Sequence, residues 1–418
     1  MKSEIISDAL NMLNDDIIEE TANVRANIKK HKKDYRKLWW KWASVAACLT
    51  FAAYAGTRIL PSIKFPNIPI LPITENVDKT TLPMLSITEN TGAAMGFEGY
   101  LVYDISELVN ENPWKETMTL STLPVYKNPL SYNKNMIASG ADFDKMRTFL
   151  IELADRFGLD TNTLTITDNA PDEKTRQQIT YKMDGNVPDG YFNPTALIIK
   201  TDDLEIEVDQ TMTAKITFEP AISLPEEYHF THYASYENIV AMADYLKNEY
   251  KDFIGIDNPH VDISGGDYNI YLQQGYQISF FDSSGNDIEQ LVNYNFNRVS
   301  FYCDDEGELF LARVYQPDLT KKVGDYPIIT VEKAKKLLAD GKYITTVPYE
   351  MPGMDYVAKT ELIYRTGALE EYYMPYYRFY VELPKELRDG TLKTYGAYYV
   401  PAVESTYISN MPVWDGSF

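Results

Sequence analysis

The feature that most constrains this chain is an apolar stretch near its N-terminus, KLWWKWASVAACLTFAAYAGTRIL at positions 37–60. The 16 residues between Lys41 and Arg58 carry no charge and would rise about 24 Å as a helix, slightly less than the ~30 Å hydrocarbon core of a bilayer. Because Lys41 and Arg58 can extend their charges to the interfaces, the longer range 38–60 would span about 34 Å. We therefore predict a single transmembrane helix over residues 39–60.

The flanks of this stretch indicate its orientation. Seven lysines and arginines fall within 29–41, and three tryptophans, Trp39, Trp40 and Trp42, lie on the same side. Basic segments stay in the cytoplasm, and tryptophans prefer membrane interfaces. The sequence therefore predicts a cytoplasmic N-terminal segment at 1–38 and an extracellular C-terminal part.

Two other interpretations of the stretch are a cleaved signal and a lipid-attachment site. A signal peptide is disfavoured because 31 residues precede the stretch 32–60 that contains the apolar run, and no clear small-x-small cleavage site follows it. VAAC at 45–48 resembles a lipobox, but a lipobox ends its apolar run, whereas Cys48 lies in the middle of this one. An uncleaved anchor is favoured, and the sequence leaves lipidation of Cys48 open.

Residues 3–24 have the pattern of an amphipathic helix. Ile6, Leu10, Leu13 and Ile17 follow one another at spacings of four, three and four, opposite a charged face. About forty cytoplasmic residues are too few to form a core of their own. The helix therefore either lies on the membrane or frays, or it docks onto a cytoplasmic partner.

Beyond the anchor the chain changes in composition. Residues 61–97 are predicted to be an extended tether, because five prolines interrupt any helix there. Residues 1–41 have a net charge of +2, whereas residues 58–418 have a net charge of −24. Such an acidic surface repels phosphate backbones, so we predict that the exported part does not bind nucleic acid.

The exported part is predicted to be α+β. Amphipathic helices are expected over 142–157, over 236–250 with Ser235 as N-cap, and from Thr330 to a stop at Gly341. Strands are expected at 163–167, 178–183, 195–201, 204–208, 211–218, 268–272, 276–281, 296–303, 308–315, 356–365, 374–383 and 394–401. Because several strands follow each helix, we predict antiparallel sheets with packed helices, in three units at 98–220, 221–320 and 321–418.

Two histidines, His229 and His232, have the H-x-x-H spacing that places two imidazoles on one face of a helix, as in some metal sites. The surrounding EEYHFTHYAS has neither a glutamate between the histidines nor a helical pattern. We therefore predict ordinary loop histidines and no metal site.

Three further segments could be taken for ligand-binding loops. The acidic segments at 282–289 (DSSGNDIE) and 304–308 (DDEGE) lack the full ligand set of a calcium loop. SGGD at 264–267 lacks the context of a phosphate-binding loop and is expected to be a flexible loop before a strand. Solvated turns are the simpler interpretation of the two acidic segments.

No pattern typical of an enzyme occurs in the sequence. There is no G-x-S-x-G elbow, and the two cysteines, Cys48 and Cys303, have no histidine in a recognisable catalytic context. The aromatic run YYMPYYRFYVEL at 372–383 alternates as strands do, which explains it more simply than a carbohydrate platform does. We predict no catalytic residue, no cofactor and a non-enzymatic function.

Two resemblances add to these patterns. MKSEIISDALNMLNDDIIEET at the N-terminus and AMGFEGYLVYDISELVNENPW at 94–114 resemble single-pass membrane proteins of low-GC Gram-positive bacteria. Some of those proteins are encoded beside extracytoplasmic-function sigma factors, so the resemblance implies an anti-sigma-factor-like role. The histidine and C-x-x-C of zinc-binding anti-sigma domains do not occur here, so such binding would proceed without zinc.

The second resemblance lies near the C-terminus. YPIITVEKAKKLLADGKY at 326–343, followed by three strands, resembles the helix-plus-sheet unit of PepSY and YycH/YycI-type regulators. Proteins of the YycH/YycI type are membrane-anchored and restrain a sensor kinase of the cell envelope. This resemblance implies a regulatory C-terminal unit.

Together these observations predict a non-catalytic, membrane-anchored sensor or regulator of the cell envelope. Its cytoplasmic partner would be a sigma factor. The alternatives are regulation of a membrane sensor kinase, or envelope or carbohydrate binding without signalling. The sequence does not identify the extracellular ligand.

Overall fold

The computed structural model divides the chain into two compact units, Met1–Lys64 and Phe65–Phe418. It describes residues 82–88, 97–132, 138–139, 141–229, 231–367, 369–386 and 391–416, all in the second unit. The predicted cytoplasmic segment 1–38, the transmembrane helix 39–60 with Cys48, and most of the tether lie outside the described residues. Among the helices of the described ranges, none combines the length and the apolar character needed to cross a bilayer.

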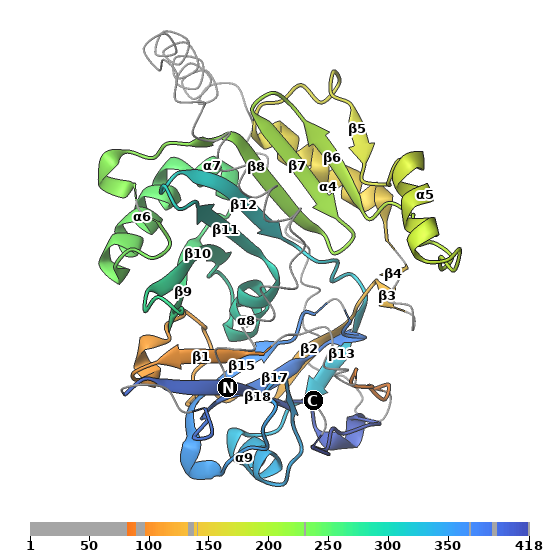
Figure 1. Ribbon diagram of the computed structural model, residues 1–418. Coiled ribbons are helices and arrows are strands. Elements are labelled where there is room, and N and C mark those ends of the chain that lie inside the picture. The colour runs from red at the N-terminus through yellow and green to blue at the C-terminus, as the bar shows by residue number, and fades with distance from the viewer. Residues whose placement is uncertain are drawn as a thin grey trace, which may run out of the picture. The chain divides into compact units, whose positions relative to one another are not determined.

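An eight-stranded antiparallel sheet forms the first lobe of the described part (Figure 1). Its strand order is β5-β6-β7-β8-β12-β11-β10-β9. The strands are β5 (Ile166–Asp168), β6 (Ala196–Lys200), β7 (Leu204–Asp209), β8 (Thr213–Ile222), β9 (Pro259–Tyr268), β10 (Gln274–Asp282), β11 (Arg298–Cys303) and β12 (Leu309–Tyr315). Helices α4 (Phe143–Arg156), α6 (Tyr236–Glu249) and α7 (Lys251–Ile254) pack with these strands in one hydrophobic core.

The second lobe combines segments from both ends of the described chain. A five-stranded sheet has the order β1-β18-β17-β15, with β14 also paired to β18, and a three-stranded sheet has the order β13-β2-β16. These strands are β1 (Gly99–Val102), β2 (Thr122–Lys127), β13 (Lys322–Pro327), β14 (Ile344–Thr345), β15 (Val357–Tyr364), β16 (Tyr372–Tyr373), β17 (Pro375–Glu382) and β18 (Lys393–Pro401). Helices α8 (Asp287–Phe296) and α9 (Val331–Ala339) contribute to its core, and β3 (Ser131–Tyr132) pairs with β4 (Ala138–Ser139) in a separate ribbon.

The predicted α+β class with antiparallel sheets is confirmed, and the main helices begin where their caps place them. The side chains of Asp142, Ser235 and Thr330 each accept a hydrogen bond from the backbone N–H three residues further on. These bonds satisfy donors that the first turn of a helix leaves unpaired. At the end of α9, Gly341 adopts a φ of 74°, the left-handed conformation that terminates a helix.

Both faces of the central strand β17 are buried. Tyr377, Phe379 and Val381 pack into the core that contains α8 and α9. Tyr376 and Tyr380 belong to two other cores on the opposite face. The aromatic run is therefore packed inside the lobe.

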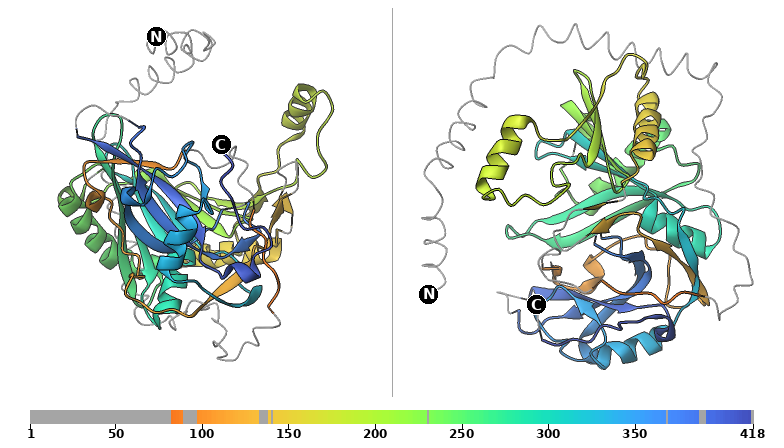
Figure 2. Two further views of the ribbon diagram at one scale, coloured as in Figure 1. Left: turned by 90° about the horizontal axis from the view of Figure 1, so that it is seen from below. Right: turned by 90° about the vertical axis from the view of Figure 1, so that its right-hand side faces the viewer.

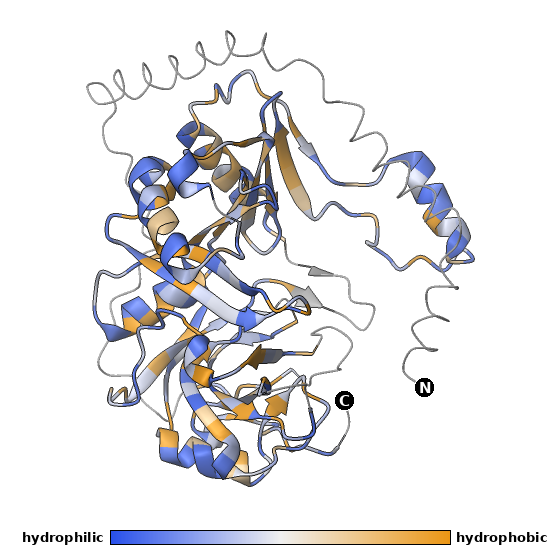
Figure 3. Cartoon of the chain, turned by 60° about the vertical axis from the view of Figure 1, so that its left-hand side comes forward, coloured by the Kyte–Doolittle hydropathy of each residue, from blue (hydrophilic) through white to orange (hydrophobic). Residues whose placement is uncertain are grey.

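The helix α5 (Glu173–Lys182) occupies the region where a strand was expected at 178–183, so that expectation is wrong. The Asp172 side chain caps the helix by accepting a hydrogen bond from the backbone N–H of Thr175 (2.7 Å), which outweighs the strand preference of the short segment that follows. α5 has no buried residue; it stands apart from the sheet in Figure 2 and is mostly hydrophilic in Figure 3.

The expected strand at 268–272 is instead the turn between β9 and β10. The side-chain oxygen of Asn269 accepts hydrogen bonds from the backbone N–H groups of Tyr271 (2.8 Å) and Gln273 (3.1 Å). Such side-chain bonds stabilise turns. The apolar residues in this turn are exposed, and the strand precedes them.

The acidic segment 282–289 contains the start of α8, a helix that was not expected. Asn286 and Glu289 form a reciprocal capping box, in which each side chain bonds to the backbone of the other residue. Leu291, Val292 and Phe296 then fall on one buried face of the helix. The N-x-x-E spacing before an apolar pattern was the signal that could have predicted this helix.

Strand pairing crosses the boundaries expected from the sequence. β8 pairs with β12 across the boundary at 220/221, so the segments on its two sides share one sheet. β1 pairs with β18, and β2 pairs with β13, so residues 99–127 belong to the lobe formed mainly by 321–416.

One part of the predicted tether packs against the domain. Leu85 and Ile87 are buried. The Leu85 N–H donates to the Tyr407 carbonyl (2.8 Å), and the Leu85 carbonyl accepts from the Ser409 N–H (2.8 Å). Residues 82–88 are therefore held by hydrogen bonds to the segment that follows β18.

Candidate functional site

A cavity of about 960 Å³ lies where the two lobes meet. The first lobe contributes residues of β9, β10, β11 and α6, and the second contributes residues of β1, β17 and the segment 108–110. Its volume is at the upper end of the ~300–1,000 Å³ typical of small-molecule sites. Because both lobes supply walls, the cavity depends on how they are joined.

Residues 105–112, called the strap from here on, join the two lobes. On the first lobe, Val109 and Gly265 exchange backbone hydrogen bonds of 3.0 and 3.2 Å. On the second lobe, the Lys359 ammonium donates to the Leu108 carbonyl (2.9 Å). The strap therefore makes polar contacts with both walls of the cavity.

The SGGD segment at 264–267 lies within β9 and is not the flexible loop that was expected. Gly265 and Gly266 adopt φ values of 127° and 102°. A Cβ atom on Gly266 would lie 2.0 Å from the Glu107 carbonyl oxygen, and one on Gly265 would lie 2.3 Å from the Gly275 carbonyl oxygen. Glycine is required at both positions, because the strap backbone approaches Gly266 and the backbone of β10 approaches Gly265 so closely.

Glu361 is the centre of a buried ion-pair network that reaches the cavity wall of the second lobe through Arg378 and Tyr380. Its side chain is 5% exposed and lies 2.9 Å from the Lys359 ammonium. It also accepts hydrogen bonds from Arg378 Nε (3.1 Å), Asn110 Nδ2 (2.7 Å) and the Tyr380 hydroxyl (3.2 Å). Burial alone would raise the pKa of Glu361, but Arg378 and Lys359 outweigh it and hold that pKa at about 2.

A second buried pair lies on the wall formed by the first lobe. Asp262 is fully buried and forms a short ion pair with Arg298. Asp262 also accepts a hydrogen bond from the Glu111 backbone N–H in the strap (2.7 Å), and Arg298 donates to the Tyr294 carbonyl (3.1 Å). Each arginine of the cavity wall therefore has a carboxylate of its own.

The end of the cavity near the β9–β10 hairpin is rich in tyrosine. Tyr276 lines the cavity there, and Tyr236 and Tyr268 each interact with Tyr276 from outside the lining; these three residues are called the tyrosine cluster from here on, and the rings of Tyr236 and Tyr276 are 5.5 Å apart. Burial raises the pKa of Tyr276, and the negative charges of Glu107 and Glu237 raise it further. The potential around this cluster is therefore negative.

Asp267, like Tyr276, lines the cavity. It follows Gly266, whose Cβ would lie 3.6 Å from the Tyr276 ring. Burial raises the pKa of the half-buried Asp267 carboxyl. Apart from its own backbone N–H, no residue in the described ranges offers this carboxylate a hydrogen-bond donor or a cation. It is an unbalanced negative charge on a cavity wall.

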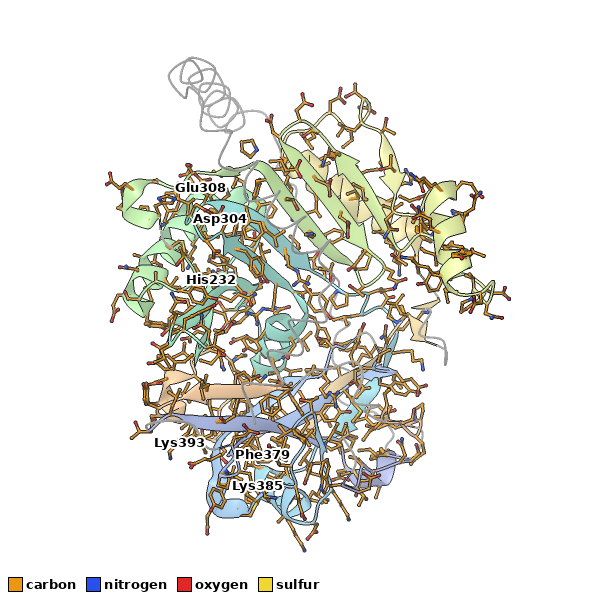
Figure 4. All side chains as sticks on the ribbon, in the orientation of Figure 1. His232, Asp304, Glu308, Phe379, Lys385 and Lys393 are labelled. Atoms are coloured by element: carbon orange, nitrogen blue, oxygen red, sulfur yellow. The ribbon has the colours of Figure 1, made fainter. Side chains whose placement is uncertain are left out.

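The histidines singled out in the sequence do not form a metal site with other described residues. His229 follows the short helix η3 (Glu226–Tyr228), whereas His232 lies in a turn that lines the cavity (Figure 4). Within the described ranges, no group of three or more His, Cys, Asp or Glu side chains is placed to hold a metal ion.

The acidic segment 304–308 forms the turn between β11 and β12, and the cysteine beside it is buried. Asp304 accepts hydrogen bonds from the backbone N–H groups of Glu306 (3.0 Å) and Glu308 (2.8 Å). Burial raises the pKa of the Cys303 thiol to about 12, so the thiol stays protonated at neutral pH.

The charged residues of the cavity were not predicted from the sequence. Glu361 and Arg378 face each other in register on β15 and β17, two strands that also carry Lys359 and Glu382. A charge between two aromatic residues, as Arg378 is between Tyr377 and Phe379, was the available signal, because a buried charge requires a partner. Which charge pairs with which depends on strand register, which the sequence did not specify.

No protein-family model and no curated protein matches the chain.

Proposed function

We propose that the protein is a non-catalytic, membrane-anchored sensor of the cell envelope, whose extracytoplasmic domain binds a ligand between its two lobes. The observation that carries this proposal is the cavity, because its walls belong to two lobes joined by the strap. A ligand that contacts both walls favours one arrangement of the lobes over others. Binding outside the cell would thereby change the state of the anchored domain.

Features of the N-terminal sequence support this location and the direction of the relay. The apolar range 39–60 would cross the membrane, with the basic and tryptophan-rich flank on the cytoplasmic side. The apolar stripe of residues 3–24 would then dock onto a cytoplasmic regulator, which we propose to be a sigma factor. The resemblance to proteins encoded beside sigma factors supports that choice of partner.

Affinity purification from detergent extracts tests the relay. We expect the full chain to retain a sigma factor and a chain lacking residues 1–28 to lose it, with a matching change in that factor's transcripts. Identical partners and transcripts in the two strains would refute the sigma-factor proposal. Recovery of a sensor kinase that crosslinks to residues 39–60 would instead support a YycH/YycI-like regulator.

Protease treatment of intact cells tests the topology. We expect added protease to cleave the domain formed by residues 97–416 without lysis, while a tag at the N-terminus stays protected. Protection of the domain until lysis would refute the extracytoplasmic location.

A further inference from the structure

We propose that the cavity binds an organic cation, with an ammonium group of the ligand placed between the Asp267 carboxylate and the Tyr276 ring, both of which line the cavity. This inference deepens the proposed function, because it names the ligand class of the same cavity. It rests on that function only in treating the cavity as a binding site.

The first argument is the charge balance of the cavity walls. Asp262 neutralises Arg298. Lys359 and Arg378 both contact Glu361. The charges of Arg378 and Glu98 act on the same two hydroxyls, those of Tyr100 and Tyr399. The two carboxylates Glu361 and Glu98 therefore balance the two cations Lys359 and Arg378. Asp267 is left without a cation in the described part of the chain, and it lines the cavity. A cationic ligand would supply the missing charge.

The second argument is the aromatic surface next to this carboxylate. The Tyr276 ring lies against Gly266, the residue before Asp267, and Tyr236 packs at an angle of 61° against Tyr276. Tyrosine rings attract ammonium groups through the negative potential of their faces. The nearby carboxylates Glu107 and Glu237 strengthen that potential. A carboxylate and a tyrosine ring in the lining of one cavity form an arrangement that recognises primary or quaternary ammonium groups.

The same charges disfavour the opposite class of ligand. The arginines of the wall already have carboxylate partners, so little positive charge is left for a phosphate or carboxylate ligand. Neutral sugars remain an alternative, since tyrosine rings and amide side chains such as Gln277 also suit them. Only a cation, however, would balance the charge of Asp267.

Titration calorimetry on the detergent-solubilised full chain tests the inference with a matched pair of probes. Choline carries the quaternary ammonium group, and dimethylbutanol is its uncharged carbon isostere. We expect choline to bind and dimethylbutanol not to bind. Equal binding of both, or no binding of either, would overturn the proposal.

A second pair of probes identifies the source of the ammonium group. Glucosamine carries a primary amine on a sugar, and N-acetylglucosamine has lost that charge. Binding of glucosamine in addition to choline would support an amine-bearing sugar, whereas binding of choline alone would support a small amine. Binding of N-acetylglucosamine as tight as that of glucosamine would favour a neutral carbohydrate and overturn the cation proposal.

Two variants locate the site. Asp267→Asn is expected to weaken choline binding by about 10- to 100-fold, because the quaternary ammonium group loses the attraction of a nearby opposite charge in a partly buried site. Tyr276→Leu is expected to weaken it by about 3- to 30-fold. Asp202→Asn removes the same charge from an exposed turn outside the cavity and is expected to change binding by less than about twofold.

The outcomes separate this inference from the proposed function. Asp267→Asn is expected to fold normally, because burial already disfavours the charged form of Asp267. Unchanged choline affinity in both cavity variants would overturn the ligand assignment even if a sigma factor is recovered. Conversely, choline binding without a cytoplasmic partner would uphold the site and refute the relay.

Discussion

Replacing Glu361 by glutamine removes the negative charge at the centre of the ion-pair network while keeping the size of the side chain. Arg378 and Lys359 then lose the carboxylate that neutralises them, although the Arg378 side chain is only 17% exposed and that of Lys359 only 28% exposed. An unpaired cation at such a position is costly because the protein solvates it poorly. We expect Glu361→Gln to destabilise the domain strongly.

The expected size of the effect follows from two independent estimates. Lowering the pKa of Glu361 from its ordinary 4.5 to about 2 corresponds to about 3 kcal/mol of stabilisation of the folded state. Breaking a buried ion pair by removing one partner costs about 3–5 kcal/mol. We therefore expect the free energy of unfolding to fall by about 3–4 kcal/mol.

Urea-induced unfolding of the full chain, followed by circular dichroism, measures this change. Glu382→Gln is the matched control on the neighbouring strand, because Glu382 pairs with Lys393 at 2.8 Å while the two side chains are 29% and 45% exposed. Such an exposed pair contributes at most about 1 kcal/mol. Equal losses in the two variants would refute the reasoning about burial.

The pH dependence of stability provides a second measurement on the same residue. Because folding lowers the pKa of Glu361, its contribution is fully present above pH 4.5 and is lost as the pH falls toward about 2. The wild-type protein is expected to lose more stability over this range than Glu361→Gln does. Parallel pH profiles would contradict the assignment.

Three further predictions concern the backbone and the buried thiol. Gly266→Ala should lower the free energy of unfolding, measured in urea, by more than about 3 kcal/mol, because the new Cβ would overlap the Glu107 carbonyl oxygen. The control Gly158→Ala, at a φ of 67° with open space around it, should lower it by only about 1 kcal/mol. In a Cys48→Ser background, Cys303 should resist thiol reagents at pH 8 until denaturant is added, because its pKa is about 12; rapid labelling of the native protein would contradict this. Leu272→Gly should raise the melting temperature by an amount equivalent to about 0.5–1 kcal/mol, because this 60%-exposed leucine has a φ of 59°; an unchanged or lower melting temperature would contradict the expected relief of strain.

The local elements of the fold could be predicted because local chemistry determines them. The helices at 142–157 and 236–250 were predicted to within a residue or two, since both combine a cap with an apolar face of helical period. The prediction failed where short segments carried competing signals. Residues 178–183 have strand-like composition but belong to a capped helix, and the apolar residues of 268–272 lie in an exposed turn.

The arrangement of these elements, and the site that depends on it, could not be predicted in the same way. The cavity is formed by segments from Tyr100 to Tyr380, and no short motif links them. Asp267 and Tyr276 come to line the same cavity because β9 pairs with β10. The Gly-Gly-Asp sequence was a partial signal, since two adjacent glycines within a strand indicate that another backbone approaches closely.

The pairing of β1 with β18 has a consequence for how the protein is made. Val102 and Lys393 are paired although they are about 290 positions apart in the chain. A chain leaves the ribosome N-terminus first, so β1 and Leu85 lack their partners for most of its synthesis. During that time the edge of β1 is unpaired, and side chains that are buried in the folded domain are exposed to solvent. The second lobe closes only after β18 and Tyr407 have emerged. Chaperone protection of the nascent domain should thus end late, and translation products that stop before β18 should be recognised as incomplete and degraded.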